Sequence, residues 1–370
     1  AVTFTNKAAR QMSERASAME GRARDCMLRT FHSFGAWFLR RYAGSSSLGL
    51  SRGFVIYDTD DSIQLLSTLR EDLPRAKAAQ IFHRISRAKD YFYTPDDPLL
   101  AQIDGSPEFR ELYRAYEKRL RQIGNADFGD LIKLPVELLR EDPVLRERFR
   151  QRFRVILVDE YQDSNVAQFA LLRELCGPAT YLCVVGDDDQ SIYRFRGAEV
   201  RNILDFPNQV EGTTVIRLED NYRSVQPILR AAEAVVSRNE GRLGKTMRAA
   251  RGQGALPVLA FLRDQDAEAA YCAELVQQSG RPWSDWAILY RTNAQSMGFE
   301  SEFLRRKIPY RVVGSLKFYE REEVKDALAL AAFCSNPRDE VAFRRIVNKP
   351  PRGIGAKAQD RLVFEALSYT

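Results

Sequence analysis

Two acidic residues directly follow a short apolar run in the segment RVILVDEYQDSN. Asp159 and Glu160 come after the β-branched run 155–158, a pattern typical of a strand buried on both faces of a parallel sheet. At the carboxyl end of such a strand, one carboxylate can hold Mg²⁺ through water while its neighbour orients or deprotonates an attacking water. Gln162 and Asp163 extend this polar group. For an acidic pair that stood alone, a turn that caps a helix would be the better interpretation.

A second polar segment, GDDDQSIYRFRGAE, follows the next apolar run. It supplies Gly186 for a tight exit from the strand, then three aspartates, then Gln190, a neutral donor able to sense a γ-phosphate. Aromatic and arginine residues alternate over 193–196. Rings give bases a stacking surface and guanidinium groups meet the phosphodiester backbone, so this stretch suits single-stranded nucleic acid. The two polar segments together favour a nucleotide site over a helix cap.

The segment GRLGKT at 241–246 resembles the end of a phosphate-binding loop but lacks its full pattern. In GxxxxGK[ST] the first glycine would stand at position 239, which is Asn239. The apolar residues before the segment recur at helical spacing, and the residues after it are interrupted by glycines and a proline. We therefore predict that Lys245 and Thr246 lie in a solvated loop and not at a phosphate.

The composition is that of an ordinary soluble protein with two or three domains. The chain has 370 residues, with 45% hydrophobic and 29% charged residues. No apolar run approaches the ~20 residues of a membrane span, and the N-terminus lacks an export pattern, so we expect a cytoplasmic protein. Five scattered cysteines without a CxxC pair argue against a zinc site or a disulfide framework. The net charge of +6 suits a polyanionic partner.

Short apolar runs and amphipathic stretches alternate along the chain, which predicts an α/β fold with parallel sheets. The predicted strands are 155–158, 181–185, 214–218, 258–262 and 286–290. From about 58 to 148 the spacing is helical, which predicts a helical insertion, and the tail from 320 is helical again. Ligands gather at the carboxyl ends of parallel strands, where the polar segments described above stand.

Five segments, in order, resemble the motifs of superfamily 1 DNA helicases of the UvrD, Rep and PcrA type. They are AVTFTNKAA, TFHSFG, VDEYQD, GDDDQSIYRFRGA and LEDNYRS. The resemblance spans essentially the whole chain and implies RecA-like motor lobes, similar to those of P-loop NTPases, with helical insertions. It also implies ATP and Mg²⁺ as cofactors, single-stranded DNA and its junctions with duplex as partners, and 3′ to 5′ movement in DNA repair or replication.

The resemblance assigns roles at the nucleotide. Asp159 and Glu160 would be the magnesium-binding and water-activating pair, and Gln190 the γ-phosphate sensor. In LEDNYRS, Tyr222 would stack on adenine, and Arg223 would reach the γ-phosphate from the second lobe as an arginine finger does. From its residues alone, this segment is a strand-to-helix turn.

The resemblance also implies a set of DNA contacts: Phe4, Thr5, Asn6, Thr30, His32, Tyr193, Phe195, Arg196, Gly353 and Gly355. His32 taken singly suits packing at a helix start, whereas its motif favours DNA contact. The family commonly has Trp where this chain has Phe195, and the smaller ring weakens the grip on a base. The glycine hairpin at 353 and 355 resembles a duplex-contacting element of the family. A plain turn between helices fits that hairpin equally well.

The resemblance implies a division into four parts, the first of which consists of two segments. These are the first motor lobe (1–40 and 150–219), a helical insertion subdomain (41–149), part of the second motor lobe (220–333) and the start of an accessory duplex-binding subdomain (334–370). In the family the GxxxxGKT loop lies shortly before the segment that here begins at Ala1. We therefore expect an internal fragment of a helicase that is inactive as an ATPase by itself.

Two alternatives stay open. The chain could be a single-stranded DNA-binding remnant that never hydrolyses ATP, which a GxxxxGKT loop encoded upstream of Ala1 would argue against. It could also be part of a helicase–nuclease recombination enzyme, which a nuclease module beyond Thr370 would favour.

Overall fold

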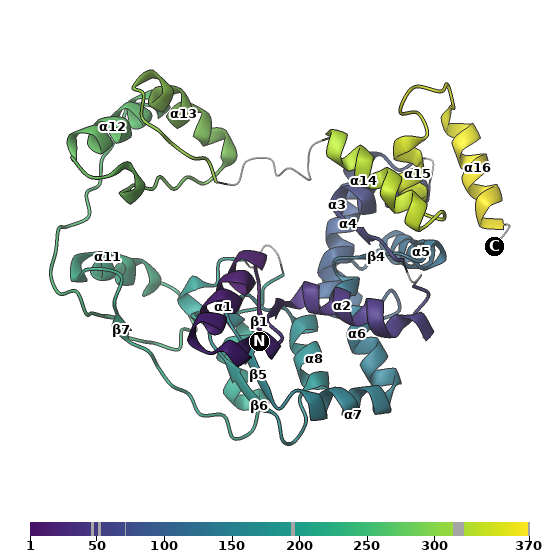
Figure 1. The fold of residues 1–370 in the computed structure, drawn as a ribbon, viewed down its shortest axis with the longest axis horizontal. Coiled ribbons are helices and arrows are strands. Elements are labelled where there is room, and N and C mark those ends of the chain that lie inside the picture. Colours follow the sequence, from purple (N-terminus) through teal and green to yellow (C-terminus); the bar gives the residue numbers. More distant parts are fainter. Residues whose placement is uncertain (46–47, 51–52, 71, 194–196, 314–321, 369–370) are drawn as a thin grey trace. The chain divides into compact units, whose positions relative to one another are not determined.

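The chain forms two units of different size (Figure 1). Unit 1 comprises Ala1–Glu219, Val235–Thr246 and Ala329–Thr370, and unit 2 comprises Asp220–Ala234 and Met247–Leu328. This computed structural model describes residues 1–45, 48–50, 53–70, 72–193, 197–313 and 322–368. Within these ranges every helix is too short or too polar to cross a lipid bilayer.

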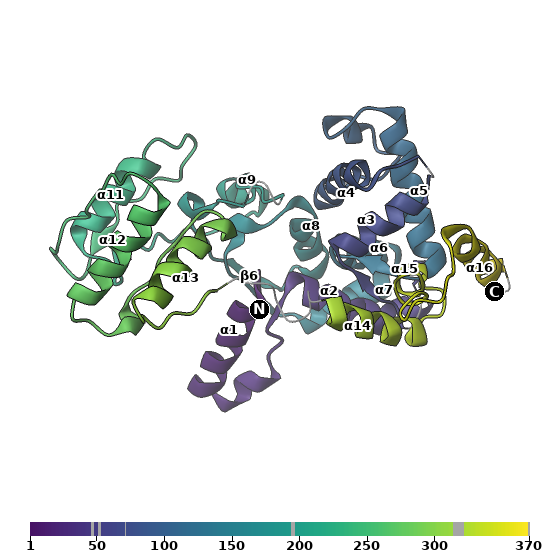
Figure 2. The ribbon, with the colours of Figure 1, turned by 90° about the horizontal axis from the view of Figure 1, so that it is seen from above.

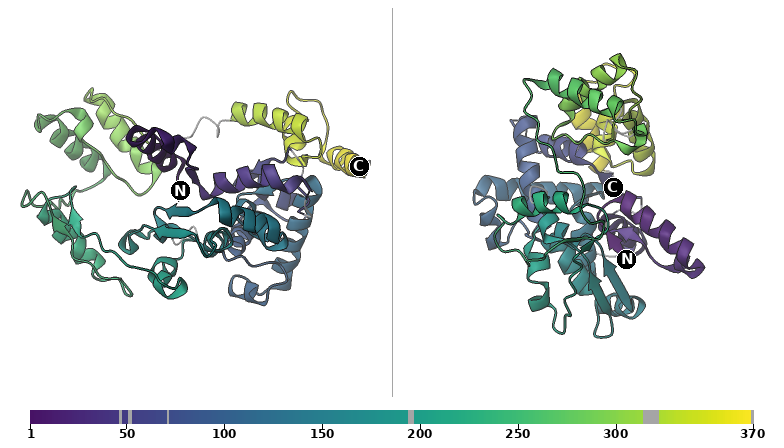
Figure 3. Two further views of the ribbon diagram at one scale, coloured as in Figure 1. Left: turned by 60° about the horizontal axis from the view of Figure 1, so that its bottom comes forward. Right: turned by 90° about the vertical axis from the view of Figure 1, so that its left-hand side faces the viewer.

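Four parallel strands form the main sheet of unit 1. Their order across the sheet is β2 (Arg29–Thr30), β1 (Val2–Thr3), β5 (Val155–Val158) and β6 (Tyr181–Val184). The two longer strands lie side by side (Figure 3). In their register Val155 is opposite Tyr181 and Val158 is opposite Val184. The predicted strands 155–158 and 181–185 are thus confirmed, the second one residue shorter, and the fold is α/β. In a parallel sheet the carboxyl ends of all strands meet at one edge.

Helices connect the strands of this sheet and follow the last of them. Those between the strands include α1 (Asn6–Met19), α2 (Phe31–Tyr42), α6 (Asp130–Glu141), α7 (Pro143–Arg152) and α8 (Val166–Leu175), and the short α9 (Arg201–Leu204) and α10 (Phe206–Gln209) come after β6. Helix α6 packs against both α2 and α8. Phe38, Leu139 and Phe149 are at most 1% exposed in the shared core. Each such side chain contributes about 1.5–3 kcal/mol through its burial, which fixes the helices that carry the strand ends.

A second, helical core forms from α3 (Thr59–Thr68), α4 (Arg75–Asp90) and α5 (Pro107–Ile123). Figures 1 and 2 show these three helices side by side. The buried residues of α5 recur at three- and four-residue spacing on one face: Phe109, Leu112, Tyr113, Tyr116, Leu120 and Ile123. The predicted helical stretch is confirmed, and a short parallel pair, β3 (Ile56–Tyr57) with β4 (Ala126–Asp127), joins it.

A cluster of charged side chains is buried in this helical part. The ammonium of Lys89 lies 2.6 Å from Glu117 Oε1, 2.7 Å from Asp127 Oδ2 and 2.8 Å from Asp130 Oδ1. Burial opposes the charge on Asp130, but Arg121 and Lys89 outweigh it and hold the pKa of that carboxyl well below its usual value. The carboxylate oxygens of the three acids lie within 4.8 Å of one another. Lys89 therefore fills the position that a metal ion would take among them.

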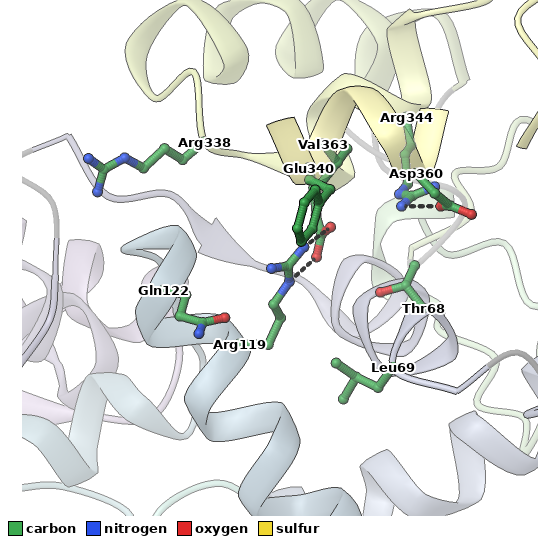
Figure 4. Close-up of a pocket in the computed structure, with 10 residues that line it drawn as sticks. Thr68, Leu69, Arg119, Gln122, Arg338, Glu340, Arg344, Asp360 and Val363 are labelled. Carbon is green, nitrogen blue, oxygen red and sulfur yellow. Dashed lines mark hydrogen bonds and ion pairs between the residues drawn. The ribbon is translucent and has the colours of Figure 1, made fainter. Parts of the chain in front are cut away.

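The C-terminal part of the described chain contains α14 (Glu322–Ser335), in which the division between the units falls, α15 (Glu340–Ile346) and α16 (Ala356–Ser368). The turn between α14 and α15 contacts the helical part of unit 1 through hydrogen bonds. Asp339 accepts hydrogen bonds from Tyr57 Oη at 2.6 Å and Asn125 Nδ2 at 3.1 Å. A cavity of about 680 Å³ lies between α3, α5, α15 and α16, and its wall includes the paired Arg119 and Glu340 (Figure 4). Among the described residues, none that the sequence predicts as a site residue lines this cavity.

Unit 2 contains α12 (Gln265–Gln278), α13 (Ser296–Arg305) and most of α11 (Gln226–Val236). Helices α12 and α13 pack together, and Ala273 and Val276 form a small core with Ile308. Strands β7 (Asp220–Asn221) and β8 (Arg248–Ala249) make a short parallel pair.

The predicted strands at 214–218, 258–262 and 286–290 are wrong. These segments form no ladder with any part of the chain that the structure describes. Most of their apolar side chains are exposed, with Ile216 at 78%, Val258 at 83% and Leu289 at 95%. An apolar run becomes a strand only where a neighbouring chain segment satisfies its backbone N–H and C=O groups, and sequence composition does not supply that neighbour.

Candidate functional site

The carboxyl edge of the main sheet gathers polar residues from neighbouring strands. The acidic pair follows β5, the GDDDQ segment follows β6, and residues 4–6 follow β1. Backbone hydrogen bonds fix this edge, because Asp159 N donates to Val2 O at 3.0 Å and Tyr161 N donates to Val185 O at 2.9 Å. The structure thus brings the acidic pair and the loop that carries Gln190 to the same edge.

The acidic pair occupies a strained and electronegative turn. Glu160 has a φ of 54°, in the left-handed region that costs a non-glycine residue roughly 1–3 kcal/mol. Burial, followed by repulsion from Glu160, raises the pKa of Asp159 above its usual value. The same two causes raise the pKa of Asp163 to about 6, and Asp163 Oδ1 is buried with no hydrogen-bond partner among the described residues. Clustered carboxylates with raised pKa values fit a site that takes a hard divalent cation.

Gln162 connects this turn to the loop after β6. Its side chain is 1% exposed; Nε2 donates to Glu160 Oε2 at 2.8 Å, and Oε1 accepts from Asp187 N at 3.0 Å. A Cβ atom added to Gly186 would lie 2.6 Å from Gln162 Oε1, so only glycine permits this approach. The sequence pattern marks Gln162 only as an extension of the polar group. No signal in the sequence shows its bridging position.

Gln190 lies at the surface in a short turn held by Asp187. Its Nε2 donates to Asp187 Oδ2 at 2.7 Å, while Asp187 Oδ1 accepts from Asp189 N at 3.1 Å. The side chain of Gln190 is exposed. The amide that the sequence predicts as a γ-phosphate sensor is therefore oriented by the protein and accessible to a ligand.

The prediction of a solvated GRLGKT loop is wrong for Lys245. Its side chain is only 18% exposed, pairs closely with Asp187, and lies 3.5 Å from Asp189 Oδ2. The segment follows helix α11 and leads into extended chain, so it does not stand between a strand and a helix. The docking was missed because the acidic partners stand far earlier in the sequence, and charge complementarity at that separation cannot be located without a fold.

The three residues after β1 that are predicted to contact DNA differ in how accessible their side chains are. Phe4 is half-buried and tilts against Phe31, with ring centroids 5.5 Å apart. Thr5 Oγ1 accepts from Ala8 N at 3.1 Å and so caps α1. Asn6 is exposed at the first position of that helix. The predicted DNA contacts of all three stay predictions.

Thr30 and His32 stand at the start of α2. Thr30 is 5% exposed, and its hydroxyl accepts from Ser33 N at 3.1 Å in a capping box. His32 is half-buried, with its ring edge-on to Phe128 at 6.1 Å between centroids, and burial lowers its pKa. Both residues have a structural role here, and their DNA contacts remain predicted.

The remaining predicted DNA contacts belong to the segment that begins at Tyr193 and to the hairpin at Gly353 and Gly355. Tyr193 is 40% exposed, whereas Phe195 and Arg196 lie outside the described residues. The hairpin between α15 and α16 is organised by Asn348, whose side chain accepts from Ile354 N at 3.1 Å and donates to Ile354 O at 2.7 Å. Gly353 has a φ of 69°, and a Cβ atom on it or on Gly355 would meet nothing within 4 Å. The backbone of this hairpin is open on one side.

Tyr222 and Arg223 belong to unit 2, in the turn between β7 and α11. Asn221 Oδ1 accepts from Arg223 N at 3.0 Å and Ser224 N at 2.8 Å. This confirms the strand-to-helix turn predicted from the residues alone. Tyr222 is 77% exposed and the side chain of Arg223 is exposed. Their action on a nucleotide stays a prediction.

Known families account for nearly the whole chain. Residues 1–211 match the UvrD/REP helicase N-terminal domain. The chain belongs to the UvrD/REP helicase family. Residues 216–369 match the UvrD-like helicase C-terminal domain. The resemblance to superfamily 1 helicases, drawn from five short segments, is thereby confirmed.

Curated members of the UvrD/REP family are similar along the full chain. The ATP-dependent DNA helicase UvrD1 of Mycobacterium tuberculosis is 42% identical over 379 residues, covering 97% of this chain and 49% of that protein. The ATP-dependent DNA helicase PcrA of Bacillus subtilis is 39% identical, covering 99% and 51%. DNA helicase II of Rickettsia typhi is 39% identical, covering 99% and 57%. The chain spans about half the length of the relatives it matches.

Proposed function

We propose that this protein acts in ATP-driven movement along single-stranded DNA, as part of a 3′ to 5′ helicase of DNA repair or replication. One observation carries the proposal: at the carboxyl edge of the main sheet, Gln162 is hydrogen-bonded both to Glu160 of the acidic pair and to Asp187 of the loop that carries Gln190. Relatives named ATP-dependent DNA helicases match along the whole chain. The +6 net charge agrees with a nucleic-acid partner.

The residues at the sheet edge divide the chemistry of ATP hydrolysis among them. Asp159 and Glu160 would hold Mg²⁺, which neutralises phosphate charge when bound. The Glu160 carboxylate orients the attacking water and accepts its proton, and Gln162 fixes that carboxylate in place. Gln190 donates to an oxygen of the γ-phosphate. From the second lobe, Tyr222 stacks on adenine and Arg223 stabilises the charge that develops on the transferred phosphoryl group.

The proposed track for DNA uses stacking and backbone contacts, which tolerate any base sequence. The exposed ring of Tyr193 follows directly after the sensor loop in the chain. Only two residues separate Gln190 from Tyr193 in the sequence. A movement of Gln190 when the γ-phosphate is bound or lost can therefore shift Tyr193 and change how tightly its ring stacks on a base. The open backbone around Gly353 would contact the phosphates of duplex ahead of the moving enzyme.

Strand separation on tailed duplexes tests the proposed function. The full-length product of the gene should release the labelled strand from a duplex with a 3′ single-stranded tail, in the presence of ATP and Mg²⁺. A duplex with a 5′ tail should stay intact, as should either duplex without ATP. Release from the 5′-tailed duplex alone would contradict the proposed polarity, and no ATP-dependent release from either would contradict the helicase function.

Gln162→Ala in the full-length product should lower kcat for DNA-stimulated ATP hydrolysis by on the order of 10- to 100-fold, because a displaced general base loses alignment with water. KM for ATP should change much less, since Gln162 is buried and is not expected to touch the nucleotide. Gln151→Ala, a change of the same kind on the exposed face of α7, serves as the control. A change in KM with kcat intact would show that Gln162 does not position Glu160.

The 370-residue polypeptide by itself should hydrolyse ATP no faster than background. Its sequence contains no GxxxxGK[ST] segment, so the donors that cradle the β- and γ-phosphates are lacking and the carboxylates repel the triphosphate. A phosphate-release assay with and without single-stranded DNA measures this. Robust DNA-stimulated hydrolysis by residues 1–370, lost in Glu160→Gln, would contradict it. DNA binding by the same polypeptide without hydrolysis would also suit a DNA-binding remnant.

A further inference from the structure

The segment Val235–Thr246, here called the strap, is docked on the loop after β6. It groups with unit 1, whereas the chain on both sides of it groups with unit 2. Arg242 forms a two-point pair with Asp189, Nε to Oδ1 at 2.7 Å and Nη2 to Oδ2 at 2.8 Å. The side chains of Arg242 and Asp189 are only 14% and 9% exposed. A bidentate, largely buried pair of this kind is among the stronger contacts available to a loop.

The strap gives each of three neighbouring aspartates its own partner. Oxygens of Asp187, Asp188 and Asp189 lie within 4.8 Å of one another, so their charges repel. Lys245 pairs with Asp187, Leu243 N donates to Asp188 Oδ2 at 3.0 Å, and Arg242 pairs with Asp189. The hydrogen bond from Arg242 lowers the pKa of Asp189 below its usual value. The strap thus supplies two cations to this acidic loop.

Asp187 joins the strap to the groups proposed to act on ATP. One of its oxygens pairs with Lys245, and the other accepts from Gln190 Nε2 at 2.7 Å. Its backbone N–H donates to Gln162, which in turn donates to Glu160 at 2.8 Å. Displacement of Lys245 would therefore leave Asp187 free to shift, and with it the amide of Gln190.

We propose that Arg242 and Lys245 are positioning residues that hold the Asp187–Gln190 loop in the geometry needed to sense the γ-phosphate. This rests on the proposed function of the site. The strap is continuous in sequence with the turn that carries Tyr222 and Arg223 and with the rest of unit 2. The docked strap makes the position of the sensor glutamine depend on a segment of unit 1 that is flanked in the sequence by unit 2 on both sides.

A charge exchange in the full-length product tests this proposal. Arg242→Glu and Asp189→Arg each place like charges together, so each should raise the hydrogen–deuterium exchange rate of residues 186–191 by on the order of 10-fold. Each should also lower kcat for ATP hydrolysis by a similar factor, with a smaller change in KM. The double variant restores an opposite-charge pair and should recover most of both losses. Arg238→Glu, the same charge change at an exposed position of the strap, should alter neither.

The outcomes separate the strap from the proposed function. A wild-type product that fails to hydrolyse ATP would contradict the proposed function, while the exchange rates would still report on the strap. A hydrolysing wild type whose single variants match it in exchange and kcat would overturn the strap proposal. A double variant that is as impaired as the worse single variant would overturn it as well, because lost folding, and not a lost pair, would then explain the singles.

Discussion

Replacing Glu160 with Gln in the full-length product should lower the DNA-stimulated rate of ATP hydrolysis by roughly 100- to 10,000-fold. The amide keeps the size and most of the hydrogen bonding of the carboxylate but cannot accept a proton from water. The left-handed turn and the hydrogen bond to Gln162 place this side chain at the edge of the sheet. ATP binding should persist, so the loss should appear in kcat.

A matched substitution separates this effect from a general loss of charge. Glu211→Gln removes the same charge at an exposed position of unit 1 and should leave hydrolysis unchanged. Phosphate release and nucleotide binding are measured on both variants. Hydrolysis by Glu160→Gln within a few-fold of wild type would remove Glu160 from the proposed role of general base.

Replacing Lys89 with Met should destabilise the helical part of unit 1 by about 3–5 kcal/mol, because removing one partner of a buried ionic group leaves the others uncompensated. The ammonium is fully buried among Glu117, Asp127 and Asp130. Without it, Arg121 and Lys133 are left to neutralise three acids. Hydrogen–deuterium exchange of α4 and α5 in the full-length product gives the free energy of local opening.

Lys77→Met provides the matched control on the same helix. Lys77 also pairs with a glutamate of α5, Glu108 at 2.9 Å, but both side chains are about half exposed. An exposed pair of this kind contributes little, so exchange in α4 should stay close to wild type. Equal exchange in the Lys77 and Lys89 variants would show that burial of the cluster does not matter to its stability.

Much of the helical structure could be predicted from the sequence, because amphipathic spacing is a local property. The spacing predicts helix from about 58 to 148, and α4 (Arg75–Asp90) lies within that stretch. The apolar runs before Asp159 and Gly186 form paired strands, whereas equally apolar runs at 214–218 and 258–262 do not. The difference is a neighbouring strand, which depends on the whole fold. Strand β1 was missed because it has only two residues and is defined by its pairing with distant chain.

Only part of the candidate site could be predicted from the sequence, and the reason is again whether a feature is local. The acidic pair and Gln190 could be located because strand ends in a parallel sheet share one edge. The bridge made by Gln162 depends on two hydrogen bonds across separate loops. The pairing of Arg242 with Asp189 joins residues 53 positions apart. Neither contact leaves a local pattern in the sequence, so both emerge only when the fold places the loops together.

A crystal structure of the full-length product with Mg²⁺ and a non-hydrolysable ATP analogue tests the proposed nucleotide site most directly. We expect the metal ion beside Asp159, and the γ-phosphate facing Glu160 and the amide of Gln190. Lys245 should remain paired with Asp187. Phosphates bound instead by Lys245 and Thr246, or a nucleotide away from the carboxyl edge of the main sheet, would contradict the proposed site.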